Sequence, residues 1–245
     1  MTGQPDFAGA IAAALDWWRD AGIDCDFVDD PQDWLAAARP VTKAAAIAKP
    51  LEPEAPPPPS LGGARESWPK TLAEFAPWWL ADASLAPQGL PRVAPRGPAG
   101  AALMILVAMP EADDGDRLLS GRCGRMVDAM LAAMGVSPDA AYVASALPAR
   151  VAMPDWAALA AQGLGAVLAH HIALAAPTRL LVFGREGIST LLGHDSPQSL
   201  SNLRSVDHEQ GSVPAISAYD LEAILAKPGF KAQLWNRWLD WTGTE

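Results

Sequence analysis

Residues 102–108 read Ala-Leu-Met-Ile-Leu-Val-Ala and form the clearest strand candidate of the chain. Every position is apolar, which is typical of a central parallel strand, because helices cover both faces of such a sheet. Further strand candidates follow at residues 142–145, 179–183 and 213–217. Helical segments separate them, and strands that alternate with helices predict a parallel sheet. We therefore expect an α/β fold, a three-layer α/β/α sandwich with a central, mainly parallel four-stranded sheet.

Apolar residues at helical spacing indicate the helices around these strands. We expect helices near residues 72–80, 121–134, 185–192 and 230–241, and one long helix over 155–175. The tryptophans at 235, 238 and 241 share one side of the last helix, which favours packing over a base-stacking platform. His171 lies on the apolar stripe of the long helix, so we expect a hydrogen-bonded core histidine there.

The chain divides into three parts by composition. Residues 1–40 form an N-terminal arm, in which Phe7, Ile11, Leu15 and Trp18 predict an amphipathic helix that ends near Gly22. Residues 41–65 form a linker, because residues 50–59 contain six prolines and cannot build a core. Residues 66–245 form the α/β/α domain. The arm helix is either a docking element for a protein partner or a helix that packs on its own domain.

Composition limits the classes of function. The chain of 245 residues has 28 acidic and 18 basic residues, a net charge of −10, which argues against tight autonomous binding to a phosphate backbone. Arg117, Arg122 and Arg125 are close enough in sequence to form a local basic patch. No apolar stretch reaches the roughly 18 residues of a membrane span, so no membrane partner is expected. The two cysteines, Cys25 and Cys123, favour free buried thiols in a cytoplasmic protein.

The segment Val213–Leu225 combines a strand end with a helix start. Residues 213–217 predict the strand and Ala218-Tyr219 the turn. Asp220 is expected to cap the following helix, since its side chain suits that position. Open α/β sheets place ligands where strands end and helices begin. Tyr219, Asp220 and Glu222 are therefore the first candidates for a site.

Several motifs now occur in a recognisable order. They are a strand ending in Pro110, an acidic loop, Gly121-Arg122-Cys123-Gly124 opening a helix, Tyr142-Val143, Leu181-Val182-Phe183-Gly184, Leu203-Arg204 and Val213-Pro214 before Tyr219. Over residues 67–243 this order resembles the uracil-DNA glycosylase superfamily, nearest to its bacterial iron–sulfur type. The resemblance implies a hydrolase of base-excision DNA repair, a DNA glycosidase. Arg122, at a helix start, and Arg204 are the nucleic-acid-binding candidates.

The resemblance also implies where the base would be held. The carboxylate that helps to position the attacking water in the superfamily is replaced by Ala108, close to Pro110. The residue that stacks on the base falls at Leu119, and the asparagine that reads its edge falls at Ser145. With Tyr219, these positions are the expected substrate contacts. The superfamily's cluster needs four ligand cysteines, so we expect no iron–sulfur cofactor and no metal.

The catalytic motif His-Pro-Ser of the superfamily falls on Asp220-Leu221-Glu222. Cleavage leaves negative charge on the departing base, which a donor must stabilise. An ionised aspartate has only acceptor oxygens. At an effective dielectric of about 20, a charge pair 4 Å apart contributes roughly 4 kcal/mol. Replacing the histidine donor with an ionised aspartate therefore costs orders of magnitude in the rate of cleavage. Asp220 and Asp113 are thus catalytic candidates by position only.

Other residues could supply the missing groups. His208 lies in the loop before the last strand and could reach the sheet end, or it is a loop hydrogen-bonder. His194 reads as a residue at a helix C-terminus. Asp113, Asp114 and Asp116 could supply a general base or a pair of metal ligands. The simpler interpretation is a solvated acidic loop.

We therefore expect a uracil-DNA-glycosylase-like protein related to base-excision DNA repair, with lost or altered glycosidic hydrolysis. DNA would bind through a local patch. The alternative is a non-catalytic protein-interaction module on a glycosylase scaffold, with a partner bound through the N-terminal helix. Missing catalytic groups and the acidic charge favour this alternative for mechanism.

Overall fold

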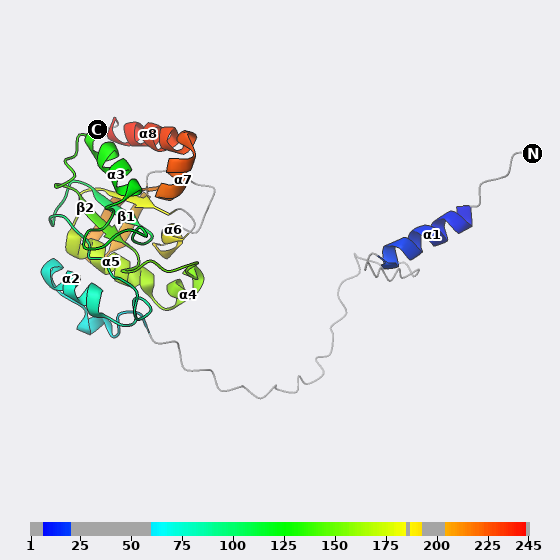
Figure 1. The fold of residues 1–245 in the computed structure, drawn as a ribbon, viewed down its shortest axis with the longest axis horizontal. Helices are drawn as coiled ribbons and strands as arrows, with labels where there is room; N and C mark the ends of the chain where they lie inside the picture. The colour runs from blue at the N-terminus through cyan, green and yellow to red at the C-terminus, as the bar shows by residue number, and fades with distance from the viewer. Residues whose placement is uncertain (1–6, 21–59, 185–186, 193–203, 244–245) are drawn as a thin grey trace, which may run out of the picture. The chain divides into compact units, whose positions relative to one another are not determined.

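The computed structural model describes residues 7–20, 60–184, 187–192 and 204–243. Contacts divide the chain into two units, residues 1–55 and 56–245. The described part of the first unit is the helix α1 (Phe7–Asp20), drawn in blue in Figure 1. In the second unit Leu61 already packs into the core, so the compact region begins upstream of residue 66.

The second unit contains a five-stranded sheet in the order β2-β1-β3-β5-β4. The strands β1 (Met104–Val107), β2 (Tyr142–Ser145), β3 (Leu180–Phe183) and β5 (Gly211–Ala218) run parallel. The fifth strand, β4 (Arg204–His208), pairs antiparallel with β5 at the edge. The predicted α/β class is confirmed, with five strands in place of the four expected.

Strand β4 was missed because its sequence, Arg-Ser-Val-Asp-His, is mostly polar. Only Val206 enters the core, while Ser205 and Asp207 are exposed, as on an edge strand with one face in water. The expectation that His208 lies in a loop is wrong. His208 pairs with Gly211 at the first residue of β5, which is the amino end of the parallel strands. It therefore lies at the edge of the sheet opposite to the strand ends that precede the helices.

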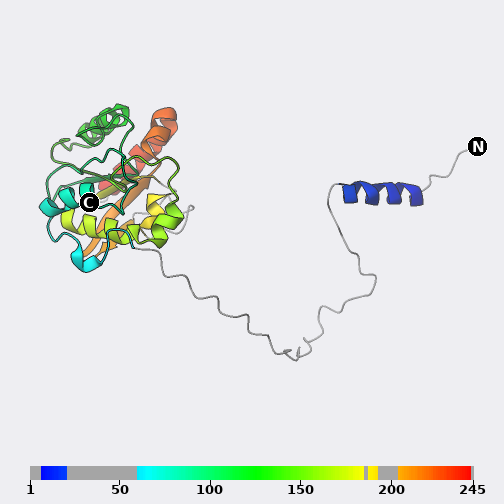
Figure 2. The same ribbon diagram turned by 60° about the horizontal axis from the view of Figure 1, so that its bottom comes forward.

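Alternate residues of the strands face two separate apolar cores. Met104 and Leu106 face one core, while Ile105 and Val107 face the other. Helices cover both faces, so the three layers are as predicted (Figures 1 and 2). One layer holds α2 (Leu72–Ala81), α4 (Trp156–Ala161), α5 (Leu164–Ala175) and α6 (Ile188–Leu191). The other holds α3 (Arg122–Ala133), α7 (Leu221–Ala226) and α8 (Pro228–Thr242).

The long helix expected over residues 155–175 is instead two helices, α4 and α5. Gly163 adopts a φ of 91°, the left-handed region that glycine tolerates and that a continuous α-helix excludes. The prediction for the last helix is confirmed, because Trp238 and Trp241 are buried and the half-buried Trp235 packs against the same core.

The strand order places a switch of direction between β1 and β3. The chain leaves β1, passes through α3 on one face of the sheet and returns as β2, which pairs with one side of β1. It then passes through α5 on the opposite face and returns as β3, which pairs with the other side of β1. The connections that leave the carboxyl ends of β1 and β3 therefore diverge. Ligands of open α/β sheets bind in the crevice at such a point.

None of the helices in the described parts of the chain is long and apolar enough to cross a membrane.

Candidate functional site

Two adjoining pockets lie at the carboxyl edge of the sheet, on the switch point. The first has a volume of about 200 Å³ and is lined by Val107, Ala108, Met109, Pro110, Glu111, Leu119, Cys123, Arg150, Phe183, Asp220, Leu221 and Glu222. The second has a volume of about 300 Å³ and is lined by Ala108, Met109, Pro154, Trp156, Gly184, Gly187, Ile188, Tyr219 and Asp220. Ala108, Met109 and Asp220 border both pockets. The lining is mostly apolar, with carboxylates among its few polar groups.

Glu111, which follows β1, lies against the first turn of α3. Its carboxylate accepts hydrogen bonds from the backbone N–H groups of Gly121 (3.0 Å), Cys123 (2.8 Å) and Gly124 (3.1 Å). These are the donors that a helix leaves unpaired at its start. The partial positive charge of the helix N-terminus also favours the carboxylate. Glu111 is therefore a side-chain cap that comes from outside the helix, and it occupies the place where an external anion would bind.

Asp114 organises the acidic loop between β1 and α3. It is buried, and its carboxylate accepts from the backbone N–H groups of Glu111 (2.9 Å), Leu119 (2.8 Å) and Ser120 (2.7 Å) and from the Ser120 hydroxyl (2.8 Å). The expectation of a fully solvated loop is therefore wrong for Asp114, while Asp113 and Asp116 are exposed. Among the residues that the structure describes, no three His, Cys, Asp or Glu side chains are grouped as metal ligands.

The Gly-Arg-Cys-Gly motif is explained by close packing at the start of α3. A Cβ at Gly124 would lie 1.8 Å from the carbonyl oxygen of Leu119, and a Cβ at Gly121 would lie 2.9 Å from a carboxylate oxygen of Glu111. Leu119 itself has a φ of 56°, a conformation that costs a non-glycine residue energy. Its hydrogen bond to Asp114 holds it there. Gly124 thus lets the helix approach this strained turn, and Gly121 leaves room for the Glu111 carboxylate.

Cys123 is a free, buried thiol in the wall of the first pocket, as predicted for this residue. Burial, together with the adjacent Glu111 carboxylate, raises the pKa of the thiol to about 12. The side chain is therefore a thiol at neutral pH and a poor nucleophile, since thiolates carry that reactivity. Cys25 lies outside the described residues.

Asp220 caps α7, as predicted. Its carboxylate accepts a hydrogen bond of 2.8 Å from the backbone N–H of Ala223. The preceding Tyr219 borders the second pocket and stacks on Phe230, with ring centroids 3.8 Å apart. Glu222 borders the first pocket, where Arg150 donates to it over 3.5 Å and to the Pro110 carbonyl over 3.3 Å. The lining of the first pocket therefore includes a long, exposed ion pair.

The other expected substrate contacts divide between the pocket and the core. Pro110 and Leu119 line the first pocket, beside Asp220. Ser145 is buried at the end of β2, and its hydroxyl donates a 2.7 Å hydrogen bond to the Leu147 carbonyl. It lines neither pocket, so this position supplies no base-reading group to either cavity.

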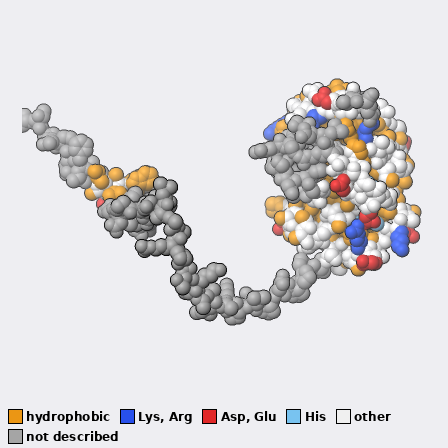
Figure 3. All heavy atoms as spheres, turned by 180° about the vertical axis from the view of Figure 1, so that it is seen from behind, with side chains coloured by type: hydrophobic (Ala, Val, Ile, Leu, Met, Phe, Trp, Pro, Cys, Tyr) orange, Lys and Arg blue, Asp and Glu red, His pale blue; other side chains and the backbone are white. Residues whose placement is uncertain are grey.

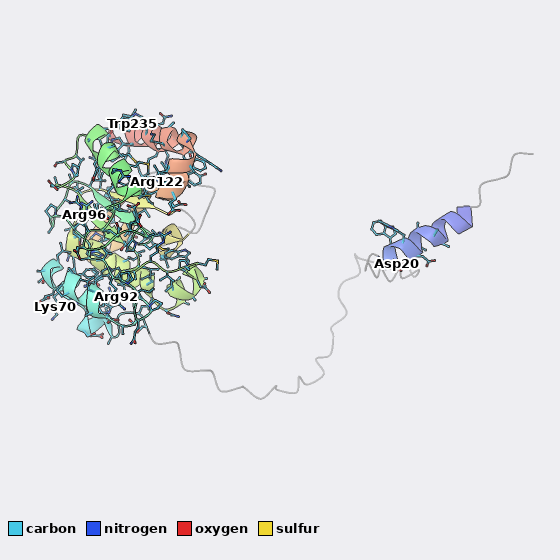
Figure 4. All side chains as sticks on the ribbon, in the orientation of Figure 1. Asp20, Lys70, Arg92, Arg96, Arg122 and Trp235 are labelled. Carbon is cyan, nitrogen blue, oxygen red and sulfur yellow. The ribbon has the colours of Figure 1, made fainter. Side chains whose placement is uncertain are left out.

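The basic candidates are exposed. Arg122, at the start of α3, is labelled in Figure 4 beside α7, and Arg117 and Arg125 are likewise exposed. The side chain of Arg204 lies outside the described residues, although its backbone begins β4. Arg122 is next in sequence to the pocket residue Cys123 and does not itself line the pocket.

None of the described histidines lines either pocket. His171 is buried in α5 and its Nε2 lies 2.8 Å from the Tyr142 hydroxyl, which confirms the predicted core histidine. Burial lowers the pKa of His171 to about 3. His170 contacts the Pro69 carbonyl over 2.8 Å. His208 lies at the opposite edge of the sheet, away from both pockets, and His194 lies outside the described residues.

The pocket residues that sequence reasoning did not single out include Glu111, Arg150 and Trp156. Glu111 caps a helix that begins eleven residues later, so no local capping pattern marks it. Trp156 lies against Gly187, where a Cβ would be 2.7 Å from the indole ring. Nothing near Arg150 in the sequence indicates the carboxylate of Glu222 as its partner.

No model of a known protein family matches the chain, and no curated protein matches it either. The resemblance to the uracil-DNA glycosylase superfamily therefore depends on the order of the motifs and remains a prediction.

Proposed function

We propose that residues 56–245 are a uracil-DNA-glycosylase-like domain, related to base-excision DNA repair, that no longer hydrolyses the glycosidic bond and acts by binding. The observation that carries this proposal is how the carboxylates at the sheet edge are used. Glu111 caps α3, Asp114 holds the acidic loop and Asp220 caps α7. These groups support the backbone around the pockets instead of facing a substrate as free acids or bases.

Leaving-group chemistry supports the loss of hydrolysis. A departing base carries negative charge, and a donor near it must lower the barrier. The side chain that the resemblance places there is Asp220, and Glu111 and Glu222 border the same pocket. Carboxylates repel the developing charge by roughly 4 kcal/mol at 4 Å for an effective dielectric of about 20. Arg150 is the basic side chain of this pocket, and it already pairs with Glu222.

The group that the resemblance assigns to water activation is missing as well. A general base must reach the attacking water within hydrogen-bond distance. Ala108 occupies the position of the expected carboxylate, and the exposed Asp113 borders neither pocket. The Ser145 hydroxyl is turned to the Leu147 carbonyl. The sheet edge therefore keeps mostly apolar pockets and lacks the two groups that the resemblance assigns to hydrolysis.

The proposal is tested with matched oligonucleotides that carry either uracil or thymine, single-stranded and duplex. We expect no abasic sites above a protein-free control, together with DNA binding that weakens steeply as salt rises. Arg122→Gln should weaken binding, whereas Lys231→Gln, which removes an exposed cation on α8, serves as the matched control. Abasic sites above the control contradict the loss of hydrolysis. Absence of binding to all four DNAs contradicts the DNA-related role.

A further inference from the structure

Most polar side chains of the first pocket already have partners within the protein. Both carboxylate oxygens of Glu111 accept from backbone N–H groups at the start of α3. Arg150 donates to the Pro110 carbonyl and to Glu222. The Cys123 side chain keeps its proton at neutral pH and is a weak donor. A ligand in this pocket therefore finds few side chains that still lack a hydrogen-bond partner.

Asp220 is the acidic side chain that borders both pockets. Its Oδ1 accepts the hydrogen bond of 2.8 Å from the backbone N–H of Ala223. Within the described parts of the chain, no group donates to the other oxygen, Oδ2. The residue is exposed, so a ligand in either pocket can reach this oxygen. The pockets thus share a hydrogen-bond acceptor that carries negative charge.

Apolar and aromatic side chains surround this acceptor. Phe183 lines the first pocket, Trp156 lines the second, and Met109 lines both. The volumes of about 200 and 300 Å³ far exceed the roughly 10–15 Å³ that one water molecule needs. Bases that proteins hold outside a double helix pack between apolar and aromatic side chains. The lining therefore suits an aromatic ring that carries a hydrogen-bond donor toward Asp220.

We propose that the two pockets take a DNA base with an exocyclic amino group, cytosine or adenine, and discriminate against uracil and thymine. The amino group donates to Oδ2 of Asp220. This inference rests on the proposed function, because it takes DNA as the source of the base. Acceptance of a hydrogen bond needs no proton transfer, so Asp220 caps α7 with one oxygen and binds the base with the other.

Uracil presents the wrong groups to a carboxylate. Its carbonyl oxygens at positions 2 and 4 are acceptors, and so are both oxygens of the aspartate. The N–H donor at position 3 lies between these carbonyls, so a carboxylate that reaches it also meets an acceptor. Cytosine carries an amino group at position 4, and carboxylates accept from this group in protein–DNA complexes. The exchange of one oxo group for one amino group therefore decides which base fits.

The test compares two matched pairs of bases in one duplex, each placed opposite an abasic-site analogue. The pairs are cytosine and uracil, and adenine and hypoxanthine, which differ by an amino group in place of an oxo group. Fluorescence anisotropy measures the affinity of the full chain. We expect the amino-bearing base of each pair to bind at least about fivefold more tightly. Charges of both signs are interspersed on the face of the second unit in Figure 3, and contacts of such charges with the backbone are common to all four duplexes.

Variants assign the preference to a residue. Asp220→Asn keeps a capping oxygen and adds a donor, and it should reduce the affinity ratio within each pair to about one. Asp139→Asn is the matched control, because it removes an exposed carboxylate in the loop before β2, at the opposite edge of the sheet. This variant should keep the ratio of the parent. A preference that survives in Asp220→Asn would overturn the assignment.

The outcomes separate this inference from the proposed function. Equal binding of all four duplexes, or tighter binding of uracil, would overturn the inference and leave the DNA-related role intact. Free 2′-deoxycytidine and 2′-deoxyuridine, followed by NMR, identify the source of the base. Binding of 2′-deoxycytidine alone, with no duplex bound, would keep the amino-group preference and contradict the DNA-related role. Absence of binding by the duplexes and both nucleosides would overturn both.

Discussion

The side-chain carboxylate of Glu111 lies 2.8 Å from the backbone nitrogen of Cys123 and thereby joins the end of β1 to the start of α3. The same carboxylate accepts from Gly121 and Gly124, so one side chain satisfies three backbone donors. This contact fixes the wall of the first pocket. It also places a negative charge beside the Cys123 thiol. The stability of the domain, the reactivity of the Cys123 thiol and the negative charge in the pocket wall therefore all depend on Glu111.

Removal of the Glu111 carboxylate should destabilise the domain. Glu111→Ala leaves three donors at the start of α3 without their partner, and we expect a loss of about 1–2 kcal/mol in the free energy of unfolding. Glu111→Gln retains one acceptor oxygen and should lose less. Urea denaturation followed by circular dichroism measures both values. Equal stability of the parent and Glu111→Ala would mean that the cap contributes nothing.

The thiol of Cys123 should resist alkylation in the folded protein. Burial and the Glu111 carboxylate raise its pKa to about 12, so the thiolate is scarce at pH 8. In a Cys25→Ser background we expect no reaction with iodoacetamide under native conditions and one modification per chain in denaturant, counted by mass spectrometry. Glu111→Gln should react faster than its parent. Rapid native labelling of the parent would contradict the environment described for this thiol.

A methyl group at Gly124 should be poorly tolerated. Its Cβ would lie 1.8 Å from the Leu119 carbonyl oxygen, so α3 or the Leu119 turn must move. We expect Gly124→Ala to cost about 1–3 kcal/mol of unfolding free energy. Gly229→Ala is the matched control, because Gly229 lies in α8 with open space around its Cβ position. That substitution should be neutral or stabilise by roughly 0.5–1 kcal/mol. Thermal melts that rank the two variants in the reverse order would refute the packing argument.

The stability of the domain should depend on His171 in mildly acidic solution. Burial lowers the pKa of His171 from 6.5 to about 3, so the folded state binds fewer protons than the unfolded state between these values. The contribution is fully present above pH 6.5 and is lost as the pH falls toward 3, by up to ~1.4 kcal/mol per pH unit. His171→Gln should flatten this part of the curve. Urea midpoints from pH 7 to pH 4 that fall in parallel for both proteins would contradict the prediction.

Local patterns predicted much of the fold. Tyr142–Ser145 is a strand with the expected bounds, and Asp220 caps α7 as its position before Leu221 suggested. The break at Gly163 was missed because two glycines, Gly163 and Gly165, among alanines and leucines barely disturb helical periodicity. Strand β4 was missed because Val206 alone among its residues is a buried apolar side chain. Such elements are decided by tertiary pairing, which outweighs weak local preference.

The sequence predicted where the candidate site lies better than it predicted which residues line the site and what they contact. The strand-to-helix junction at Tyr219-Asp220 lies on the pockets because parallel strands end at a shared edge. Glu111 and Arg150 act through partners that are ten or more residues away in sequence, so their roles appear only in the folded chain. Asp114 reads as one of several loop acids, yet the fold turns it inward toward four donors.

The most direct test of the account is single-turnover base release with protein in excess over a uracil-containing single-stranded oligonucleotide. The parent chain and Asp220→Asn, which keeps a capping oxygen and removes the charge, are compared with a protein-free control. We predict that neither protein forms abasic sites faster than the control. A parent rate above the control that disappears in Asp220→Asn would contradict the claim that the sheet-edge carboxylates hold the backbone and carry out no hydrolysis.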